Sequence, residues 1–292
     1  MIHTLPDKKN HAGLTRTAWT KRAIPRALAL PALALIAILL SGCNSHAGST
    51  VIVAGSTSVQ PYAEVLAEEF AHHSPEYEVD VQGGGSSAGI TAARSGTADI
   101  GMSSRHLNEK EEDLWSVEIA KDGLSVIIHP GNPIENLTLD QIRDIYAGVI
   151  TDWQSLGGNA AKIHLISREE GSGTRSAFEE LVMSKIPITP RAIIQDSNGA
   201  VRQLVSDDRN SIGFISLGLV DLSVKAITLD GVEGTMDNVL NGSYSLHRPF
   251  LYVSAGEPAG PAKAFVDYTL SDEGQLLLMH EGLIPRTEGV EQ

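Results

Sequence analysis

The stretch TVIVAGSTSVQPYAEVLAEEFAHH, residues 50–73, decides the fold. It begins with a short, mostly apolar run, residues 50–55, which has the length of a buried strand. From Val59 to Phe70 the apolar residues recur at helical spacing, and a Gly/Ser/Thr turn joins the two segments. The stretch therefore predicts a strand that is followed at once by a helix, the repeating unit of an α/β protein.

The same unit recurs along the chain. Further strands are expected at 77–82, 98–103, 162–167 and 211–216, and further helices at 88–96, at 137–148 and from about Thr174 onward. This rhythm predicts a mixed, mostly parallel sheet with helices on its faces. No linker in the sequence is long enough to separate independent domains.

The N-terminus has the order of an export signal. Lys21, Arg22 and Arg26 precede an apolar run at 27–40, which is too short for a comfortable membrane span and ends in LSGC at 40–43. LSGC resembles the bacterial lipobox, in which the cysteine receives the lipid, palmitate included. The sequence therefore predicts a lipoprotein signal peptide at 1–42, lipidation of Cys43 and a tether at 43–49; the alternative is an ordinary signal peptide followed by a buried cysteine.

The charge of the chain argues against a polyanionic partner. A leader with six basic residues and one acidic residue leaves 16 basic and 35 acidic residues, a net charge of −19 on the rest of the chain. Such a body is a poor partner for nucleic acid or for an anionic membrane surface. The acidic excess is equally compatible with a salty habitat.

Four turns after predicted strands share one composition. They are AGSTSVQP (54–61), GGGSSAGI (83–90), GMSSRHL (101–107) and REEGSGTRSAF (168–178). Glycines allow a ligand to approach the backbone, hydroxyls donate hydrogen bonds, and the first N–H groups of a helix have no partner within it. In an open α/β sheet such turns gather at the carboxyl ends of the strands, where they form an anion site. Each turn alone could be an ordinary helix cap, and Arg105 and Arg168 could be solvated surface charges.

A serine hydrolase is the competing interpretation. Residues 85–89 match G-x-S-x-G, with Ser86 or Ser87 as the nucleophile and His247 or His280 downstream. No HGGG-like segment precedes the motif, and a single nucleophile gives the other turns no role. The sequence also has neither a nucleotide phosphate loop nor a metal-ligand spacing of histidines. We therefore expect a binding protein, with no cofactor, no metal and no catalytic residue.

The turns, together with ADIGMSSR, IYAGVITDWQSLGG and SIGFISLG, appear in an order that resembles the PstS-type phosphate-binding proteins of bacterial phosphate ABC transporters. The resemblance implies a type II periplasmic-binding fold, two α/β lobes with the ligand in the cleft between them. The first lobe is then expected at 50–128 plus 249–292, and the second at 129–248. The resemblance further implies that the protein captures inorganic phosphate outside the cytoplasm. It would deliver the anion to transmembrane permease subunits driven by a cytoplasmic ATPase.

The resemblance also assigns residues of this chain to the ligand. From the first lobe it assigns Thr57, Ser58, Ser86, Ser104 and Arg105. From the second lobe it assigns Arg168, Ser172, Gly173 and Thr174, with Glu170 as the partner that orients Arg168.

One position departs from the best-known members of the family. Their aspartate, which accepts the proton of phosphate and repels sulfate, is replaced here by Ser104. Asp99 is a nearby carboxylate, but its place in a predicted strand favours a structural role at least as much. Receptors for sulfate or molybdate therefore stay open as alternatives.

Overall fold

The computed structural model describes residues 49–286, which all belong to one compact unit, residues 48–292. The predicted signal peptide, Cys43 and the tether up to residue 48 lie outside the described residues. Within the described part, no helix is long and apolar enough to cross a membrane.

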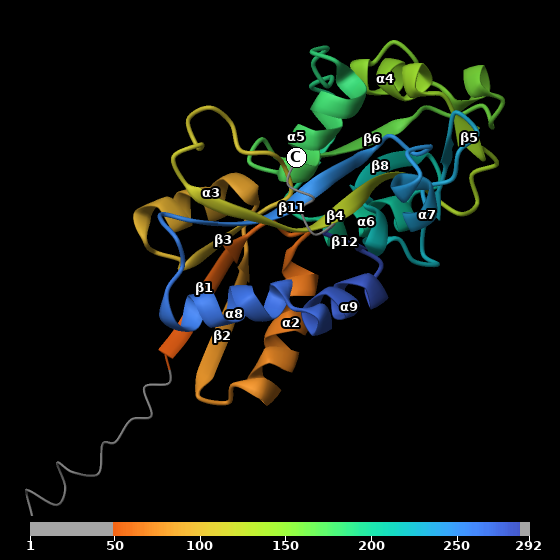
Figure 1. The fold of residues 1–292 in the computed structure, drawn as a ribbon. Helices are drawn as coiled ribbons and strands as arrows, with labels where there is room; N and C mark the ends of the chain where they lie inside the picture. Colours follow the sequence, from red (N-terminus) through yellow and green to blue (C-terminus); the bar gives the residue numbers. More distant parts are fainter. Residues whose placement is uncertain (1–48, 287–292) are drawn as a thin grey trace, which may run out of the picture. The chain divides into compact units, whose positions relative to one another are not determined.

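One sheet runs through this unit, with the strand order β2-β1-β3-β11-β4-β8-β6-β7 (Figure 1). Two short strands, β9 and β12, pair with β4 outside this path, and β5 and β10 form a separate pair. The strands are β1 (Ser49–Gly55), β2 (Tyr77–Gly83), β3 (Ile100–Ser103), β4 (Trp115–Ile128), β5 (Asn136–Leu137), β6 (His164–Arg168), β7 (Ile193–Gln195), β8 (Ser211–Ser216), β9 (Lys225–Ala226), β10 (Thr228–Leu229), β11 (His247–Ser254) and β12 (Ile284–Pro285).

The two ends of the sheet are parallel and its centre is antiparallel. At one end β1 runs parallel to β2 and β3, and at the other β6 runs parallel to β7 and β8. Between these ends, β4 and β11 run antiparallel to each other, β11 is antiparallel to β3, and β4 is antiparallel to β8. The predicted mixed α/β sheet is confirmed, and its antiparallel part is made by these two long central strands.

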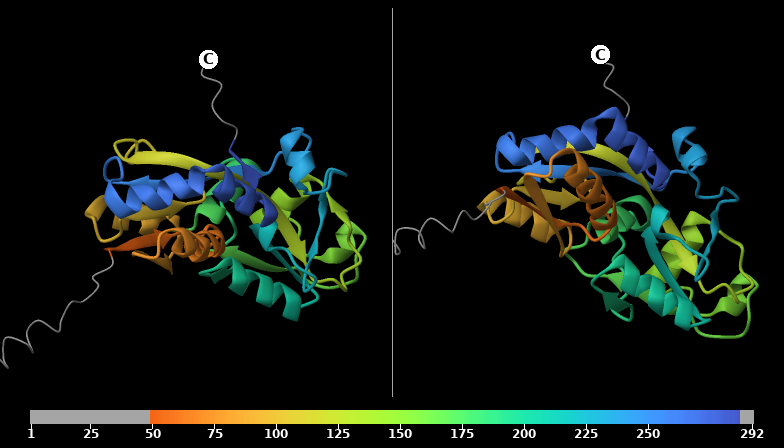
Figure 2. Two further views of the ribbon diagram at one scale, coloured as in Figure 1. Left: turned by 60° about the horizontal axis from the view of Figure 1, so that its bottom comes forward. Right: turned by 90° about the horizontal axis from the view of Figure 1, so that it is seen from below.

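Helices cover both faces of the sheet. They are α2 (Gln60–His73), α3 (Ser86–Ser95), α4 (Leu139–Ala147), α5 (Gly173–Phe178), α6 (Asn198–Asp207), α7 (Met236–Leu240), α8 (Gly260–Leu270) and α9 (Asp272–His280). Short 3-10 turns occur at Trp153–Leu156 and Leu217–Leu219, and α5 continues into a π-helical turn, Glu179–Met183. In Figures 1 and 2 the blue helices α8 and α9 follow one another along one side of the sheet.

The first core lies between the β1 end of the sheet and helices α2, α8 and α9. Along β11 the side chains alternate, as a strand requires. Phe250 and Tyr252 enter this core, while Leu251 and Val253 pack on the other face with Ile90 of α3. The helices therefore sandwich this end of the sheet.

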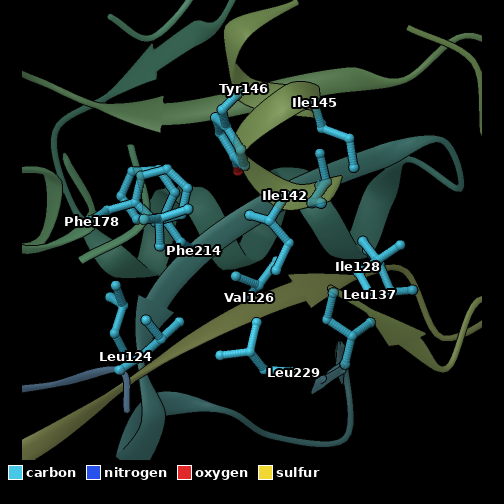
Figure 3. Close-up of a cluster of buried hydrophobic side chains, with 14 of the residues drawn as sticks. Leu124, Val126, Ile128, Leu137, Ile142, Ile145, Tyr146, Phe178, Phe214 and Leu229 are labelled. Carbon is cyan, nitrogen blue, oxygen red and sulfur yellow. The ribbon is translucent and has the colours of Figure 1, made fainter. Parts of the chain in front are cut away.

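The second core fills the space between β4, β8 and helices α4 and α5 (Figure 3). The rings of Phe178 and Phe214 stack there, with centroids 4.1 Å apart and planes 5° from parallel, and Tyr146 meets both rings edge-on. On the opposite face of the sheet, Val201 and Val205 of α6 pack against Ile127 of β4. This end of the sheet is therefore sandwiched in the same way.

The two cores share the central strands. On β4, Ala120 belongs to the first core and Leu124 to the second. Leu246, directly before β11, belongs to the second core, and Phe250 to the first. The two-lobed fold is thus joined by two neighbouring strands. The residue limits of the moving lobes, with 129–248 as the second lobe, stay a prediction.

Candidate functional site

The first three strands end side by side, and their turns meet. Since β1 lies between β2 and β3, Gly55 is in register with Gly83 on one side and Met102 on the other. Beyond these ends Ser56 Oγ donates to Ser104 Oγ at 2.9 Å, and the backbone N–H of Ser104 donates to Ser86 Oγ at 3.0 Å. The three predicted turns of the first lobe therefore form one connected group of buried hydroxyls.

Glycines bring the helix α3 close to β1. A Cβ on Gly89 would lie 2.4 Å from the carbonyl oxygen of Ala54 and 2.6 Å from Cα of Gly55, so only glycine fits this crossing. Gly55 itself has a φ of +139°, which is outside the range that L residues readily adopt. Gly89, the second glycine of the G-x-S-x-G match, is therefore required by the packing of α3 on β1.

The second lobe supplies two further turns. Arg168 ends β6, and the loop after it leads to Ser172, whose hydroxyl caps α5 by accepting from the N–H of Arg175 at 3.2 Å. After β7, the hydroxyl of Ser197 caps α6 in the same way, and Asn198 is the first residue of that helix. Both helices thus begin shortly after the carboxyl ends of the parallel strands β6 and β7, the place at which an anion site is predicted.

The turns of the two lobes touch. Ser58 Oγ lies 2.8 Å from Thr174 Oγ1, and Arg168 Nη2 donates to Thr57 Oγ1 at 3.2 Å. A Cβ on Gly173 would lie 2.3 Å from Ser86 Oγ and 2.5 Å from Ser104 Oγ. The structure thus brings seven of the nine predicted ligand residues into one cluster, which we call the hydroxyl cluster: Thr57, Ser58, Ser86, Ser104, Arg168, Gly173 and Thr174.

Arg168 is held rigidly although it is almost fully buried, with 1% of its surface exposed. Its Nε and Nη2 each donate to one carboxylate oxygen of Glu169 at 3.0 Å, and the carbonyls of Gln195 and Asp196 accept further bonds. Nη1 is buried and has no protein partner within the described residues. The guanidinium is thereby oriented with one N–H edge still available for an acceptor.

The partner predicted for Arg168 is wrong. Glu170 was expected to orient the guanidinium, but its side chain is exposed, and Glu169 forms the bidentate pair instead. The backbone explains the difference. The N–H of Glu169 donates to the carbonyl of Gln195, which keeps Glu169 beside Arg168 at the end of the sheet while Glu170 turns outward.

Arg105 and Ser172 lie at the edge of the hydroxyl cluster. Arg105 forms a bidentate pair with Glu111, at 2.7 and 2.9 Å, and also donates to Ser87 Oγ at 3.3 Å. Burial alone would raise the pKa of Glu111, but hydrogen bonds from Arg105 and Asn108 lower it below the ordinary value. Because the charge of Arg105 is neutralised and the hydroxyl of Ser172 serves as a cap, direct ligand contacts by these two residues stay predictions.

Sequence reasoning missed a buried ion pair beneath the cluster. Asp122 on β4 and Arg248 on β11 face each other in register, both almost fully buried, and Arg248 also donates to Ser58 Oγ at 3.0 Å. Burial raises the pKa of Asp122, while the charge of Arg248 and a hydrogen bond from Ser216 oppose that rise. Asp122 follows Lys121 and lies near Glu118, so the sequence gives no signal that singles it out as a buried charge.

Asn198 was missed for another reason. Its amide donates to Ser58 Oγ at 2.8 Å and to Thr57 Oγ1 at 3.4 Å, so Asn198 is in direct contact with the hydroxyl cluster. The segment IIQDSNGAV has the same order of strand, polar turn and helix as the turns that were recognised. Only the paucity of hydroxyls and glycines in that turn set it apart.

The structure assigns Asp99 a structural role. Its carboxylate accepts from the N–H of Ile52 at 2.8 Å, and its own N–H donates to the carbonyl of Ile52 at 2.9 Å. These bonds tie the turn before β3 to Ile52, the middle residue of β1. Asp99 is thus bonded to the strand itself and not to the hydroxyl cluster.

The hydrolase interpretation finds no support in the geometry. Ser86 Oγ accepts from the Ser104 backbone and contacts the Ser104 hydroxyl, and Ser87 Oγ accepts from Arg105. Neither serine has a histidine among its hydrogen-bond partners in residues 49–286. In the same residues no group of three histidine, cysteine, aspartate or glutamate side chains is placed to hold a metal ion.

Known proteins resemble this chain over most of its length. Residues 44–273 match the model of the PBP superfamily domain. The phosphate-binding protein PstS of Bacillus subtilis (strain 168) is 30% identical over 251 residues, which cover 84% of this chain and 83% of the relative. PstS of Pseudomonas aeruginosa (strain UCBPP-PA14) is 31% identical over 263 residues, which cover 79% and 81%.

Solved structures show the same likeness. A Clostridium perfringens protein, described as a candidate phosphate ABC transporter substrate-binding protein and solved with bound phosphate, is 46% identical with a TM-score of 0.80. The match covers 82% of this chain and all of that chain. An ABC-type phosphate transport receptor from Vibrio cholerae is 39% identical with a TM-score of 0.68, over 81% and 100%. The chain therefore belongs to the PBP superfamily and, within it, to the family of PstS phosphate-binding proteins.

Proposed function

We propose that this protein captures inorganic phosphate outside the cytoplasm and delivers it to the permease of an ABC transporter. One observation carries the proposal: buried hydroxyls and a rigid guanidinium from two lobes meet in one cluster. The Clostridium perfringens relative, all of which matches 82% of this chain and which was solved with bound phosphate, supports phosphate as the ligand.

The chemistry of the cluster suits a tetrahedral oxyanion. Hydrogen bonds to a charged group contribute about 1.5–3 kcal/mol each, so several of them together can exceed the roughly 8 kcal/mol of a micromolar complex after ordering costs. The net charge of −19 repels the anion only at long range, because the Debye length is about 8 Å at physiological salt. The local donors then decide the affinity.

Transport requires only binding and lobe movement. The direct contacts between Ser58 and Thr174 and between Arg168 and Thr57 join the lobes, and an anion that accepts from all four residues would hold them closed. A permease that separates the lobes would weaken these bonds together and release the anion. No covalent step is needed, so we propose no enzymatic activity.

Calorimetric titration of the purified protein, freed of bound anion, tests the proposal. We expect phosphate to bind with micromolar or tighter affinity and with a stoichiometry of one. The absence of a phosphate signal, in a protein shown to be folded by circular dichroism, would refute it.

Ser104 supports a second candidate, a receptor with a wider range of oxyanions. The hydroxyl of Ser104 is neutral, so it lacks the charge by which an aspartate would repel a fully ionised anion such as sulfate. Titration with sulfate and molybdate distinguishes the two candidates. An affinity for either anion that equals the phosphate affinity would favour the wider receptor.

We further propose that lipid on Cys43 anchors the protein to the membrane. The family match begins at residue 44, directly after this cysteine. Cys43→Ala should move the protein from the membrane fraction of cells to the soluble fraction. Retention of the variant in the membrane fraction would refute the anchor.

A further inference from the structure

The buried arginine beneath the hydroxyl cluster is in contact with the site. Arg248 is the second residue of β11, which lies beside β4 (Figure 1). Its Nε and Nη2 donate to Asp122 Oδ2 on β4 at 3.1 and 3.0 Å. Ser216 Oγ donates to the other oxygen of Asp122 at 2.7 Å. The guanidinium is therefore fixed on its carboxylate, with only 3% of the residue exposed.

Arg248 and Asn198 converge on one hydroxyl. Arg248 Nη2 donates to Ser58 Oγ at 3.0 Å, and Asn198 Nδ2 donates to the same oxygen at 2.8 Å. The orientation of the Asn198 amide is set by a backbone group, because the N–H of Ser216 donates to its Oδ1 at 3.3 Å. Both groups that face Ser58 are therefore donors.

The two donors fix the direction of the Ser58 hydroxyl. A serine hydroxyl has two acceptor lone pairs and one hydrogen. Arg248 and Asn198 occupy both lone pairs, so the third neighbour, Thr174 Oγ1 at 2.8 Å, must receive the hydrogen. Ser58 can only donate toward the site.

The hydroxyl of Thr57 is also held in the donor orientation, here by Arg168 and Asn198. Its Oγ1 accepts from Arg168 Nη2 at 3.2 Å and from Asn198 Nδ2 at 3.4 Å. Its hydrogen is then the only part of the hydroxyl left for a ligand. Two adjacent hydroxyls thus present hydrogens, and never lone pairs, to an anion.

We propose that Arg248 is a positioning residue of the anion site: acting through Ser58, it holds the site's hydroxyls in the donor orientation. The inference rests on the proposed function. Without Arg248 one lone pair of Ser58 is freed, the hydroxyl can rotate, and an anion must first turn its hydrogen outward. Preorganised donors bind more tightly than donors that must be ordered on binding.

The test removes the donor without leaving a buried charge unpaired. In the variant Asp122→Asn/Arg248→Met both charges of the pair are lost together, since the loss of one alone would destabilise the fold strongly. Arg248→Lys is the rescue variant, because an ammonium group near the place of Nη2 can donate to Asp122 and to Ser58 at once.

Phosphate affinity is measured by calorimetry, with thermal unfolding as the check on folding. We expect the double variant to bind at least tenfold more weakly than the wild type, and Arg248→Lys to stay within about threefold. An affinity of the folded double variant within twofold of the wild type would overturn the inference. A wild type that binds no phosphate would instead refute the proposed function, so the two failures are distinct.

A cycle with Ser58→Ala separates positioning from a merely structural effect. If Arg248 acts through Ser58, adding Asp122→Asn/Arg248→Met to Ser58→Ala changes the affinity by less than twofold, although the same double variant weakens binding at least tenfold when Ser58 is present. Fully additive losses would overturn the positioning role.

Should the double variant fail to fold, Asn198→Ala tests the same idea from the other donor. It frees a lone pair of Ser58 while leaving the ion pair intact. We expect its loss of affinity to be smaller in the Ser58→Ala background than in the wild type, and an equal loss in both backgrounds would overturn the inference.

Discussion

Ser58 and Thr174 place their hydroxyl oxygens 2.8 Å apart although 116 positions separate them in the chain. Ser58 lies in the turn between β1 and α2 of one lobe, and Thr174 is the second residue of α5 in the other. Their contact shows that the turns recognised in the sequence as separate anion-binding segments converge into a single site. The following predictions test how that site binds, closes and selects.

Removal of the buried guanidinium should abolish tight binding. We expect Arg168→Ala to lower phosphate affinity at least a hundredfold, because a buried charge-assisted donor, whose Nη1 has no protein partner among the described residues, is lost. Calorimetry measures the effect. Arg191→Ala, which removes the same charge from an exposed position of the same lobe, is the control and should change affinity less than twofold. Equal effects of the two variants would remove Arg168 from the site.

The close approach of the lobes should depend on Gly173. We expect Gly173→Ala to reduce phosphate affinity at least tenfold, because its Cβ would fall 2.3 Å from Ser86 Oγ and 2.5 Å from Ser104 Oγ. Gly199→Ala is the matched control, since a Cβ there meets no atom within 4 Å. Thermal unfolding without ligand should stay close to the wild type for both. Unimpaired binding by Gly173→Ala would show that the lobes need not approach so closely.

Ser104 should set the selectivity between oxyanions. We expect Ser104→Asp to lower sulfate affinity more than phosphate affinity, because a carboxylate accepts the proton of phosphate and repels an anion that has none. Ser104→Ala removes the same hydroxyl without adding a charge and should leave the ratio of the two affinities nearer to the wild type. Titrations with both anions measure the ratio. The same ratio in the aspartate and alanine variants would contradict the prediction.

The Arg105–Glu111 pair should make stability depend on pH. Because the pKa of Glu111 is lowered in the folded state, its contribution is present above the unfolded pKa of about 4.3 and is lost as pH falls through the lower, folded value. The unfolding temperature of Glu111→Gln should therefore decline less on acidification from pH 5 than that of the wild type. Glu112→Gln, an exposed neighbour, is the control. Parallel curves for Glu111→Gln and the wild type would refute the link.

Much of the fold was predictable because it is encoded locally. The strand at 50–55 and the helix after it follow from apolar spacing alone, and the structure has them as β1 and α2. The antiparallel centre was not predictable in this way. Asp122 and Arg248 are 126 positions apart, and nothing local announces that their strands pair.

The site shows the same division. Turns rich in glycine and hydroxyls could be recognised one by one, because each carries its own capping chemistry. The sequence could not show that Glu169 rather than Glu170 pairs with Arg168, because this pairing depends on a backbone hydrogen bond to Gln195 of another strand. Asn198 and Arg248 were not recognised because they contact Ser58 from distant parts of the chain.

The two central strands, β4 and β11, determine whether the protein can be cut into two fragments that fold separately. β4 passes from one hydrophobic core into the other, and β11 does so together with Leu246, the residue before it, so the two cores share these strands. A chain cut between Ala120 and Leu124 would leave both fragments with an unpaired edge and an open core. We therefore expect the two lobes to unfold in one cooperative transition and to resist separate expression, unlike domains that are joined by a linker.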